Sequence, residues 1–462
     1  MKSTTRRAFV VFLLAAFFTA GLVYLGVNLG VNAEKWATLR VNTHLVNEGS
    51  FIGAGNVLDR NGEILAKTLK GERVYNDSED IRRSTLHIVG DSEGYIASGV
   101  QTAYKRELVG YNRITGIYAL KKYERGNDVT LTIDSEISAV ALDALGNRKG
   151  VVALYNYKTG ELLCSVSSPN FDIRNKPSVE DIEKNESGEY DGLYLNRLID
   201  GLYTPGSVFK LVTAACVIEN VSDISSWEYD CEEEMYINGV KISCPKEHGK
   251  VDFEEALVKS CNCAFAELST KITPAQLLNT AKQFKFGESF SFGNSVTEKS
   301  ILDLEEASNS DFAWCSVGQY TTLVNPYHML TIAGAIANDG TAKLPFVVKS
   351  IASPSGRKIS EAQAEEVVYI SPETASELKK MMRNTVKDNY GDWNFGGVKM
   401  CGKTGTAEVS ETENPHSWFL GFCEDEKTPL AIVVVVENGG WGSSTAIPVA
   451  SEVILEGVKN IK

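Results

Sequence analysis

The longest apolar stretch of the chain covers residues 8–31 and contains no charged side chain. A helix rises about 1.5 Å per residue, so this stretch is long enough to cross a bilayer core of about 30 Å. Three basic residues precede it: Lys2, Arg6 and Arg7. Because basic flanks stay in the cytoplasm, we predict a cytoplasmic tail over 1–7, one membrane anchor over 8–31 and an extracytoplasmic remainder. A cleaved signal peptide is the alternative, although its apolar core usually spans only about 7–15 residues.

Beyond the anchor, the apolar pattern alternates between the periods of strands and helices. Alternating or compact apolar segments around polar turns predict hairpins over residues 53–66 and 151–168, a strand from Lys403 onward, and a hairpin formed by residues 418–422 and 430–437. Helical spacing predicts helices over residues 139–145, 209–218 and 447–458. This order indicates an α+β fold, in which an antiparallel sheet is flanked by helices.

The pattern changes near Asp128, where alternation begins. We therefore predict an N-terminal domain over residues 32–127 and a larger domain over 128–462. The charge balance changes this picture little. The chain has 46 basic and 60 acidic residues, a net charge of −14, which argues against nucleic acid as a partner.

Nine cysteines are many for a chain that is exported. Five of them lie in or near apolar or motif segments and are expected to be small buried hydrophobes: Cys216, Cys261, Cys263, Cys401 and Cys423. Cys231 and Cys244 flank a predicted hairpin turn and could pair, but the sequence does not settle their connectivity. A metal site at Cys231, Cys244 and His248 lacks a clear fourth ligand, so we predict no metal site.

The first candidate for chemistry is the segment 204–210, Thr-Pro-Gly-Ser-Val-Phe-Lys, which opens the predicted helix. Ser207 and Lys210 lie three residues apart, so the lysine amine can reach the serine hydroxyl. Three other Ser-x-x-Lys spacings occur, but only Lys210 is surrounded by enough apolar sequence to be desolvated. Desolvation matters because a lysine at its ordinary pKa of about 10.4 is protonated and cannot accept the serine proton.

Two later segments strengthen this candidate. Ser260-Cys261-Asn262 and Lys403-Thr404-Gly405-Thr406 follow in the order Ser-x-x-Lys, Ser-x-Asn, Lys-Thr-Gly. Either segment alone is more often a cap or a turn. The ordered set resembles the motifs of penicillin-binding proteins and serine β-lactamases. The resemblance extends from about Gly126 to the C-terminus, and residues 53–66 are similar to the segment that opens the extracytoplasmic part of these proteins, with Ala54 in place of the usual arginine.

The resemblance is closest to class B penicillin-binding proteins, which implies a membrane-anchored peptidoglycan D,D-transpeptidase with 32–127 as a non-catalytic pedestal. It implies these catalytic residues: Ser207 as nucleophile, Lys210 as base, Ser260 as proton relay, Asn262 as positioning group, and Lys403 as the cation that lowers the pKa of Lys210 and attracts the substrate carboxylate. It further implies substrate binding along Thr404, Gly405 and Thr406. The oxyanion would be held by the backbone amides of Ser207 and Thr406.

The implied partners are peptidoglycan stem peptides, as D-Ala-D-Ala donor and amine acceptor, β-lactams, and a polytopic SEDS-type glycosyltransferase in the same membrane. No cofactor is implied. Two alternatives stay open: an enzyme that passes the acyl group to water, as D,D-carboxypeptidases and β-lactamases do, and a non-catalytic penicillin-binding sensor or scaffold. Against the first, Ser-Cys-Asn replaces the Ser-Asp-Asn of class A β-lactamases, and no glutamate can be assigned as a deacylating base.

Overall fold

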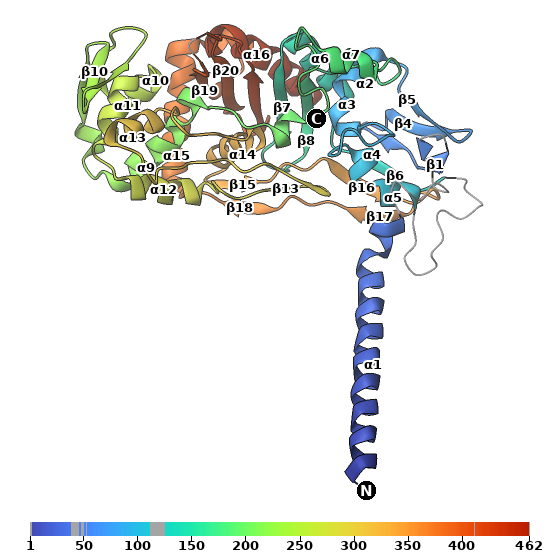
Figure 1. Cartoon of the computed structure of the whole chain (residues 1–462). Coiled ribbons are helices and arrows are strands. Elements are labelled where there is room, and N and C mark those ends of the chain that lie inside the picture. The colour runs from blue at the N-terminus through green and yellow to red at the C-terminus, as the bar shows by residue number, and fades with distance from the viewer. Residues whose placement is uncertain are drawn as a thin grey trace.

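The computed structural model describes residues 2–37, 46–47, 50–51, 53–110, 125–410 and 412–461. Helix α1 (Lys2–Ala37) projects away from the rest of the chain (Figure 1). Among the described helices, only α1 is long and apolar enough to cross a membrane, over its segment Thr4–Asn32. None of this apolar segment is buried against the rest of the chain. The helix fits the predicted single-pass anchor.

A five-stranded sheet forms the centre of the larger part of the chain. Its strands run antiparallel in the order β19-β20-β21-β7-β8, so β19 lies at one edge. Their bounds are β7 (Gly150–Asn156), β8 (Leu162–Ser168), β19 (Met400–Ala407), β20 (His416–Cys423) and β21 (Leu430–Val436). All seven residues of β21 are buried because helices cover both faces of the sheet. The predicted hairpins in 151–168 and 418–437 are confirmed.

The two faces of the sheet carry separate apolar clusters. On one face, α6 (Ser135–Leu145) and α16 (Gly442–Asn460) pack against alternate residues of the strands, such as Val152 and Val434. On the other face, α14 (Pro326–Ala337) packs against the intervening residues. The predicted fold class, α+β with an antiparallel sheet flanked by helices, is confirmed, as are the helices expected over 139–145 and 447–458.

A second sheet of six strands has the order β17-β16-β6-β3-β4-β5 (Figure 1, near α1). Its strands are β3 (Val57–Leu58), β4 (Ile64–Leu69), β5 (Glu72–Tyr75), β6 (Asp128–Leu131), β16 (Val348–Ala352) and β17 (Lys358–Glu361). The predicted hairpin in 53–66 is confirmed, and its turn is fixed by Asp59, whose carboxylate accepts from the N–H groups of Asn61 and Glu63. The sheet takes strands from both sides of residue 127. The division at 127/128 stays a prediction, and part of 32–127 lies outside the described residues.

The far end of the molecule from this sheet is a lobe of short helices and ribbons (Figure 1). Two small antiparallel ribbons belong to it, β9 (Glu228–Cys231) with β12 (Gly249–Asp252), and β10 (Glu234–Ile237) with β11 (Val240–Ser243). The lobe's helices are η3 (Ile224–Ser226), α9 (Lys210–Asn220), α10 (Phe253–Val258), α11 (Asn262–Ser269), α12 (Pro274–Gln283), α13 (Asn309–Ser316), α15 (Pro372–Asn384) and η4 (Thr385–Tyr390). In α9 every side chain from Lys210 to Val217 is buried, as the apolar pattern predicts.

The other described elements connect these parts. They are β1 (Val46–Asn47), β2 (Ser50–Phe51), α2 (Glu79–Ser84), α3 (Leu86–Val89), α4 (Val100–Ala103), α5 (Lys105–Val109), α7 (Val179–Lys184), α8 (Arg197–Asp200), η2 (Gly206–Val208), β13 (Ser291–Phe292), β14 (Ser295–Val296), β15 (Thr341–Lys343), β18 (Glu366–Val368) and η5 (Asp392–Phe395).

Candidate active site

Ser207 lies in the short 3-10 turn η2, directly before α9 begins at Lys210. The α-helix therefore begins one residue later than the helix predicted over 209–218, and Ser207 lies in the turn before it. The reason is the close approach of β19: Gly206 has φ +53°, and a Cβ atom there would lie 2.6 Å from the carbonyl oxygen of Thr406. Only glycine allows this contact, which places the backbone of the nucleophile turn against the edge strand.

The Lys210 side chain is fully buried and its amine points toward the segment before α11. Nζ donates to the carbonyl oxygen of Ser260 at 2.8 Å and to Oδ1 of Asn262 at 2.7 Å, and Ser260 Oγ lies at 3.5 Å. The Phe265 ring centroid is 5.3 Å from Nζ. All three hydrogen bonds that this amine donates thus go to the Ser-x-Asn motif.

The Ser-x-x-Lys spacing predicts that Lys210 Nζ reaches the hydroxyl of Ser207. Among the described residues, no hydrogen bond joins these two groups, because the amine is turned toward Ser260 and Asn262. The two residues nevertheless share one turn of backbone at the η2–α9 junction. The direct contact between nucleophile and base stays a prediction, since catalytic hydrogen bonds are often long before substrate binds.

Ser260 lies between the two lysines of the site. Its hydroxyl accepts a hydrogen bond from Lys403 Nζ at 2.9 Å. Nζ of Lys210, from the Ser-x-x-Lys motif, lies 3.5 Å from the same oxygen. Ser260 has φ +56°, a left-handed backbone conformation that non-glycine residues adopt rarely and that is concentrated at functional sites. This local conformation brings the hydroxyl and the carbonyl of one residue toward Lys210 at once.

Asn262 is the first residue of α11, and its side chain is held at both ends. Oδ1 accepts from Lys210, and Nδ2 donates to the carbonyl oxygen of Ser243, the last residue of β11, at 2.9 Å. The amide orientation is therefore set by the ribbon that precedes α10. Ser243 is a supporting residue that sequence reasoning missed, because only the fold brings β11 beside the motif.

Burial sets the protonation of the two lysines. It lowers the pKa of Lys210 to about 8, while the neighbouring thiols, with Cys261 the largest of these effects, act to raise it. Burial also lowers the pKa of Lys403 well below its ordinary value, and the charge of Lys210 lowers it further. The resemblance to penicillin-binding proteins implies that the charge of Lys403 lowers the pKa of Lys210. In the structure, burial is the main cause of the lowered pKa at both lysines, and the charge of Lys210 acts on Lys403 in the same direction. The effect of Lys403 on the pKa of Lys210 stays a prediction.

Thr404 and Thr406 lie on β19, the strand at the free edge of the five-stranded sheet. The N–H of Thr404 donates to the hydroxyl of Tyr390 at 3.0 Å, so it points away from β20. In a strand, N–H groups two residues apart face the same side, so the N–H of Thr406 also faces the free edge, beside η2. The backbone amides of Ser207 and Thr406 therefore lie on facing segments.

Tyr390 is the second residue that sequence reasoning missed. It is the last residue of η4, a π-helical segment, and its buried hydroxyl also lies 2.7 Å from Thr404 Oγ1. π-Helical turns are often found at functional sites. The segment Thr385–Tyr390 has no motif in the sequence that distinguishes it.

The structure thus brings Lys210, Ser260, Asn262 and Lys403 into one hydrogen-bonded group, with Ser207 one turn away. Gly405, between the two threonines, is packed against the carbonyl of Pro205: a Cβ atom at Gly405 would lie 2.6 Å from that oxygen. The arrangement offers a nucleophile, two buried amines that can exchange a proton through a serine hydroxyl, and backbone donors at an open strand edge. Such a set is suited to acyl transfer.

Comparisons with known proteins agree with this chemistry. The sequence pattern of the penicillin binding protein transpeptidase domain matches residues 150–455. Peptidoglycan D,D-transpeptidase PbpA of Mycolicibacterium smegmatis is 28% identical over 395 residues, covering 79% of this chain and 80% of that protein. Stage V sporulation protein D of Bacillus subtilis is 26% identical over 444 residues, covering 86% and 67% respectively.

Solved structures have the same fold. The D,D-transpeptidase domain of a peptidoglycan glycosyltransferase from Eggerthella lenta aligns with a TM-score of 0.75 at 25% identity, covering 89% of this chain and 100% of that one. The penicillin G acyl-enzyme complex of penicillin-binding protein A from Mycobacterium tuberculosis aligns with a TM-score of 0.75 at 24% identity, covering 88% and 100%.

Proposed function

The chain belongs to the penicillin-binding protein transpeptidase family, as a class B member, and from that premise we propose that it crosslinks peptidoglycan stem peptides through an acyl-enzyme on Ser207. The observation that carries this proposal is the convergence of the buried amines of Lys210 and Lys403 on Ser260 Oγ, beside the nucleophile turn. The chain is then a serine D,D-transpeptidase that uses no cofactor.

In the acylation step, Ser207 Oγ attacks the carbonyl of the penultimate D-Ala and its proton passes to neutral Lys210. The bond to the terminal D-Ala nitrogen breaks, and Ser260 relays a proton to this leaving amine. Asn262 holds the Lys210 amine in place through its Oδ1. General acid–base transfer of this kind contributes about 10²–10⁴-fold in rate.

The substrate itself helps to deprotonate Lys210. When its terminal carboxylate binds beside Lys403, the negative charge raises the pKa of that amine and draws a proton onto it. Ser260, which contacts both amines, gives the proton a path from Lys210 to Lys403. Lys210 is then the neutral base, and Lys403 the cation that holds the carboxylate.

The donor peptide binds as an extra strand along β19. Main-chain hydrogen bonds to an exposed strand edge are a common way to hold an extended peptide, and Thr404 to Thr406 offer this edge. The N–H groups of Ser207 and Thr406 face the carbonyl where negative charge develops. Removing one such donor from an oxyanion site typically costs about 10²–10³-fold in rate.

An amine of a second stem peptide then takes the acyl group from Ser207. The D,D-transpeptidase name of the mycobacterial relative supports this acceptor. We place the catalytic part, 128–462, outside the membrane on the pedestal 32–127, with α1 as the anchor of a bacterial cell membrane and residues 1–7 in the cytoplasm. A SEDS-type glycosyltransferase in the same membrane would supply the glycan strands, and β-lactams would acylate the same serine.

Intact-protein mass spectrometry tests the proposal on the full-length chain in detergent. Attack of Ser207 on the β-lactam carbonyl opens the ring and loses no atoms, so the chain should gain the mass of one whole penicillin G. Ser207→Ala should prevent this gain, while Ser355→Ala, in an exposed turn at another Ser-x-x-Lys spacing, should leave it unchanged. Absence of any adduct would support a non-catalytic sensor or scaffold.

A second measurement follows the fate of the acyl group. With a D-Ala-D-Ala peptide, added amine acceptor should divert most of the acyl group into a new peptide bond. Release of D-Ala that no amine acceptor changes would indicate a D,D-carboxypeptidase. Rapid turnover of penicillin to penicilloic acid would indicate a β-lactamase.

A further inference from the structure

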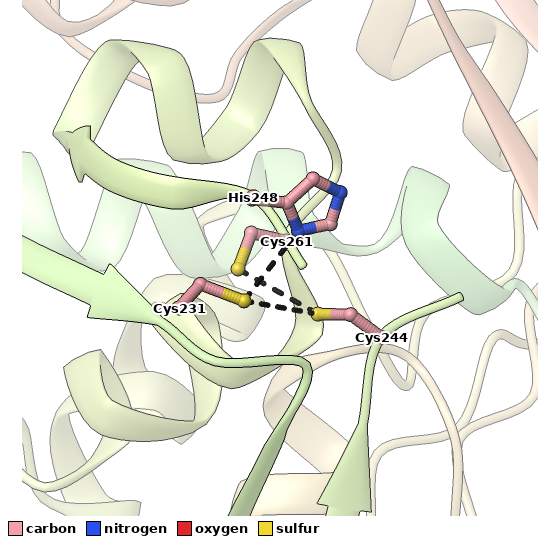
Figure 2. A group of neighbouring side chains, drawn as sticks. All are labelled: Cys231, Cys244, His248 and Cys261. Atoms are coloured by element: carbon pink, nitrogen blue, oxygen red, sulfur yellow. Dashed lines mark hydrogen bonds between the residues drawn. The ribbon is translucent and has the colours of Figure 1, made fainter. Parts of the chain in front are cut away.

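Four side chains with metal-binding atoms meet beside the Ser-x-Asn motif (Figure 2). They are Cys231, Cys244, His248 and Cys261, and their ligand atoms all lie within 4.8 Å of one another. Cys231 ends β9, Cys244 follows β11, and His248 precedes β12. Cys261 is the N-cap residue of α11. The ribbons of the lobe and the helix that carries Asn262 thus contribute to one cluster.

The separations in this cluster match those of a tetrahedral metal site. Zn–S bonds of about 2.3 Å and Zn–N bonds of about 2.0–2.1 Å place two sulfurs about 3.8 Å apart, and a sulfur and a nitrogen about 3.6 Å apart. Sγ of Cys231 lies 3.8 Å from Sγ of Cys244 and 3.6 Å from Nδ1 of His248. Sγ of Cys244 lies 3.6 Å from Sγ of Cys261.

We propose that Cys231, Cys244, His248 and Cys261 bind one Zn²⁺ ion. Three cysteine sulfurs and one imidazole nitrogen are a common ligand set of structural zinc sites, and soft sulfur ligands favour zinc over calcium or magnesium. The three thiols release three protons when the metal binds. The segment 231–248 contains no clear fourth ligand, so the sequence alone predicts no metal site. The fold brings Cys261, from outside this segment, to the other three residues.

The backbone around the cluster is arranged to receive thiolates. The N–H groups of Asn262 and Cys263 donate to Sγ of Cys244, at 3.2 and 3.5 Å, and the N–H of Ala264 donates to Sγ of Cys261 at 3.3 Å. These are amides of the first turn of α11, where N–H groups lack helical acceptors and favour negative charge. Cys261 is fully buried, as an enclosed structural site requires.

Cys263 is close to the cluster but has other partners. Its sulfur lies 3.6 Å from Sγ of Cys244, and its thiol also donates to the carbonyl oxygens of Glu233 at 3.4 Å and Ile242 at 3.6 Å. It is not among the four residues whose ligand atoms are mutually close. Cys263 is therefore the matched control for the four ligands.

A disulfide between Cys231 and Cys244 is the competing use of these residues in an exported protein. The two sulfurs are not bonded in the structure, where both cysteines are free. A disulfide between Cys231 and Cys244 would also not explain why His248 and Cys261 lie beside them. The zinc site accounts for all four residues, and the two states exclude each other because a disulfide removes two ligands.

The proposed ion would also fix the motif that faces Lys210. Cys261 lies between Ser260 and Asn262, so a metal bond to its sulfur restrains both neighbours. The zinc site itself does not depend on the proposed transpeptidase function, because its first readouts are metal content and spectrum.

Elemental analysis of the full-length chain, purified in detergent under reducing conditions after growth with zinc, tests the site. We expect about one zinc per chain in the wild type, and less than about a fifth of that in Cys231→Ser, Cys244→Ser and His248→Ala, because a structural site needs all four ligands. Cys263→Ser should retain the metal, and so should Cys315→Ser, a buried cysteine whose sulfur contacts Thr322 instead. Substitution by Co²⁺ should give the strong visible absorption of tetrahedral cobalt and sulfur-to-cobalt charge-transfer bands.

A measurement on the wild type covers the case in which the variants do not fold. Titration of the thiols with an organomercurial should release the zinc, which a chelating dye detects. Zinc-depleted protein should acylate more slowly with penicillin and recover when Zn²⁺ is returned. A wild-type chain that holds no zinc after incubation with Zn²⁺ and reductant would overturn the proposal. So would zinc retained in both Cys231→Ser and Cys244→Ser, or a Cys231–Cys244 disulfide in metal-free protein that reduction does not convert to a zinc-binding form.

Discussion

Replacement of Asn262 by Asp tests whether neutral Lys210 is the base. Oδ1 of Asn262 lies 2.7 Å from Lys210 Nζ, and an aspartate of the same shape would place a negative charge there. The charge stabilises the ammonium form, so the pKa of Lys210 rises. The neutral amine, present above that pKa, then becomes scarcer at neutral pH, and acylation slows.

The size of the effect follows from the pKa of Lys210, which burial lowers to about 8. At about pH 7, roughly a tenth of this lysine is neutral, and an adjacent carboxylate that raises the pKa by about two units reduces that share to about a thousandth. Acylation by Asn262→Asp should therefore be about 100-fold slower at neutral pH. The loss should shrink as the pH rises toward about 10.

Rates of labelled-penicillin acylation, measured between about pH 6 and pH 10, provide the assay. For the wild type, the rate should rise with pH and level off above about 8. Asn262→Ala is the matched control: it removes the same acceptor without adding charge, so its midpoint should not move upward. An unchanged midpoint in Asn262→Asp, with a lower rate at every pH, would show that Lys210 is not the titrating base.

Three further predictions concern other parts of the molecule. Tyr390→Phe removes the hydroxyl that contacts Thr404 twice. An unpaired buried N–H costs about 1–3 kcal/mol, so the free energy of unfolding in urea should fall by about that amount, and an unchanged value would show that this contact does not stabilise the fold. Arg197→Met breaks the ion pair between Nε and Glu437 Oε1, 2.7 Å apart with Arg197 buried, and should lower the free energy of unfolding in urea by about 3–5 kcal/mol; a change within about 0.5 kcal/mol would contradict this. Protease added to intact spheroplasts should digest the chain beyond about residue 31, and protection of the C-terminal part would refute the predicted orientation.

Local patterns were sufficient to predict the central sheet. In β21, Leu430–Val436 is apolar throughout because both faces of the strand are buried, and this pattern is visible in the sequence. The turn at Asn61-Gly62 likewise follows from residue types that favour tight turns. Such elements depend on neighbours a few residues away, so the sequence alone constrains them.

The candidate site was predicted less evenly. The order of motifs identified Ser260, Asn262 and Lys403, which the fold does bring around Lys210. Tyr390 was missed because its role depends on a π-helical turn that packs against an edge strand, and neither feature has a local sequence signal. The strong effect of burial on both lysines also depends on the fold, because segments far apart in the sequence enclose the two amines.

The middle residue of the Ser-x-Asn motif explains why the metal cluster could not be predicted in the same way. Ser260 and Asn262 point toward the lysines, while Cys261, between them, points to the opposite side and meets Cys244. The left-handed φ of Ser260 and the start of α11 produce this divergence. A motif read along the chain assigns all three residues to one site. In the structure this segment lies between two sites. A shift of Cys261 would therefore move Asn262, the next residue in the chain, which holds Lys210.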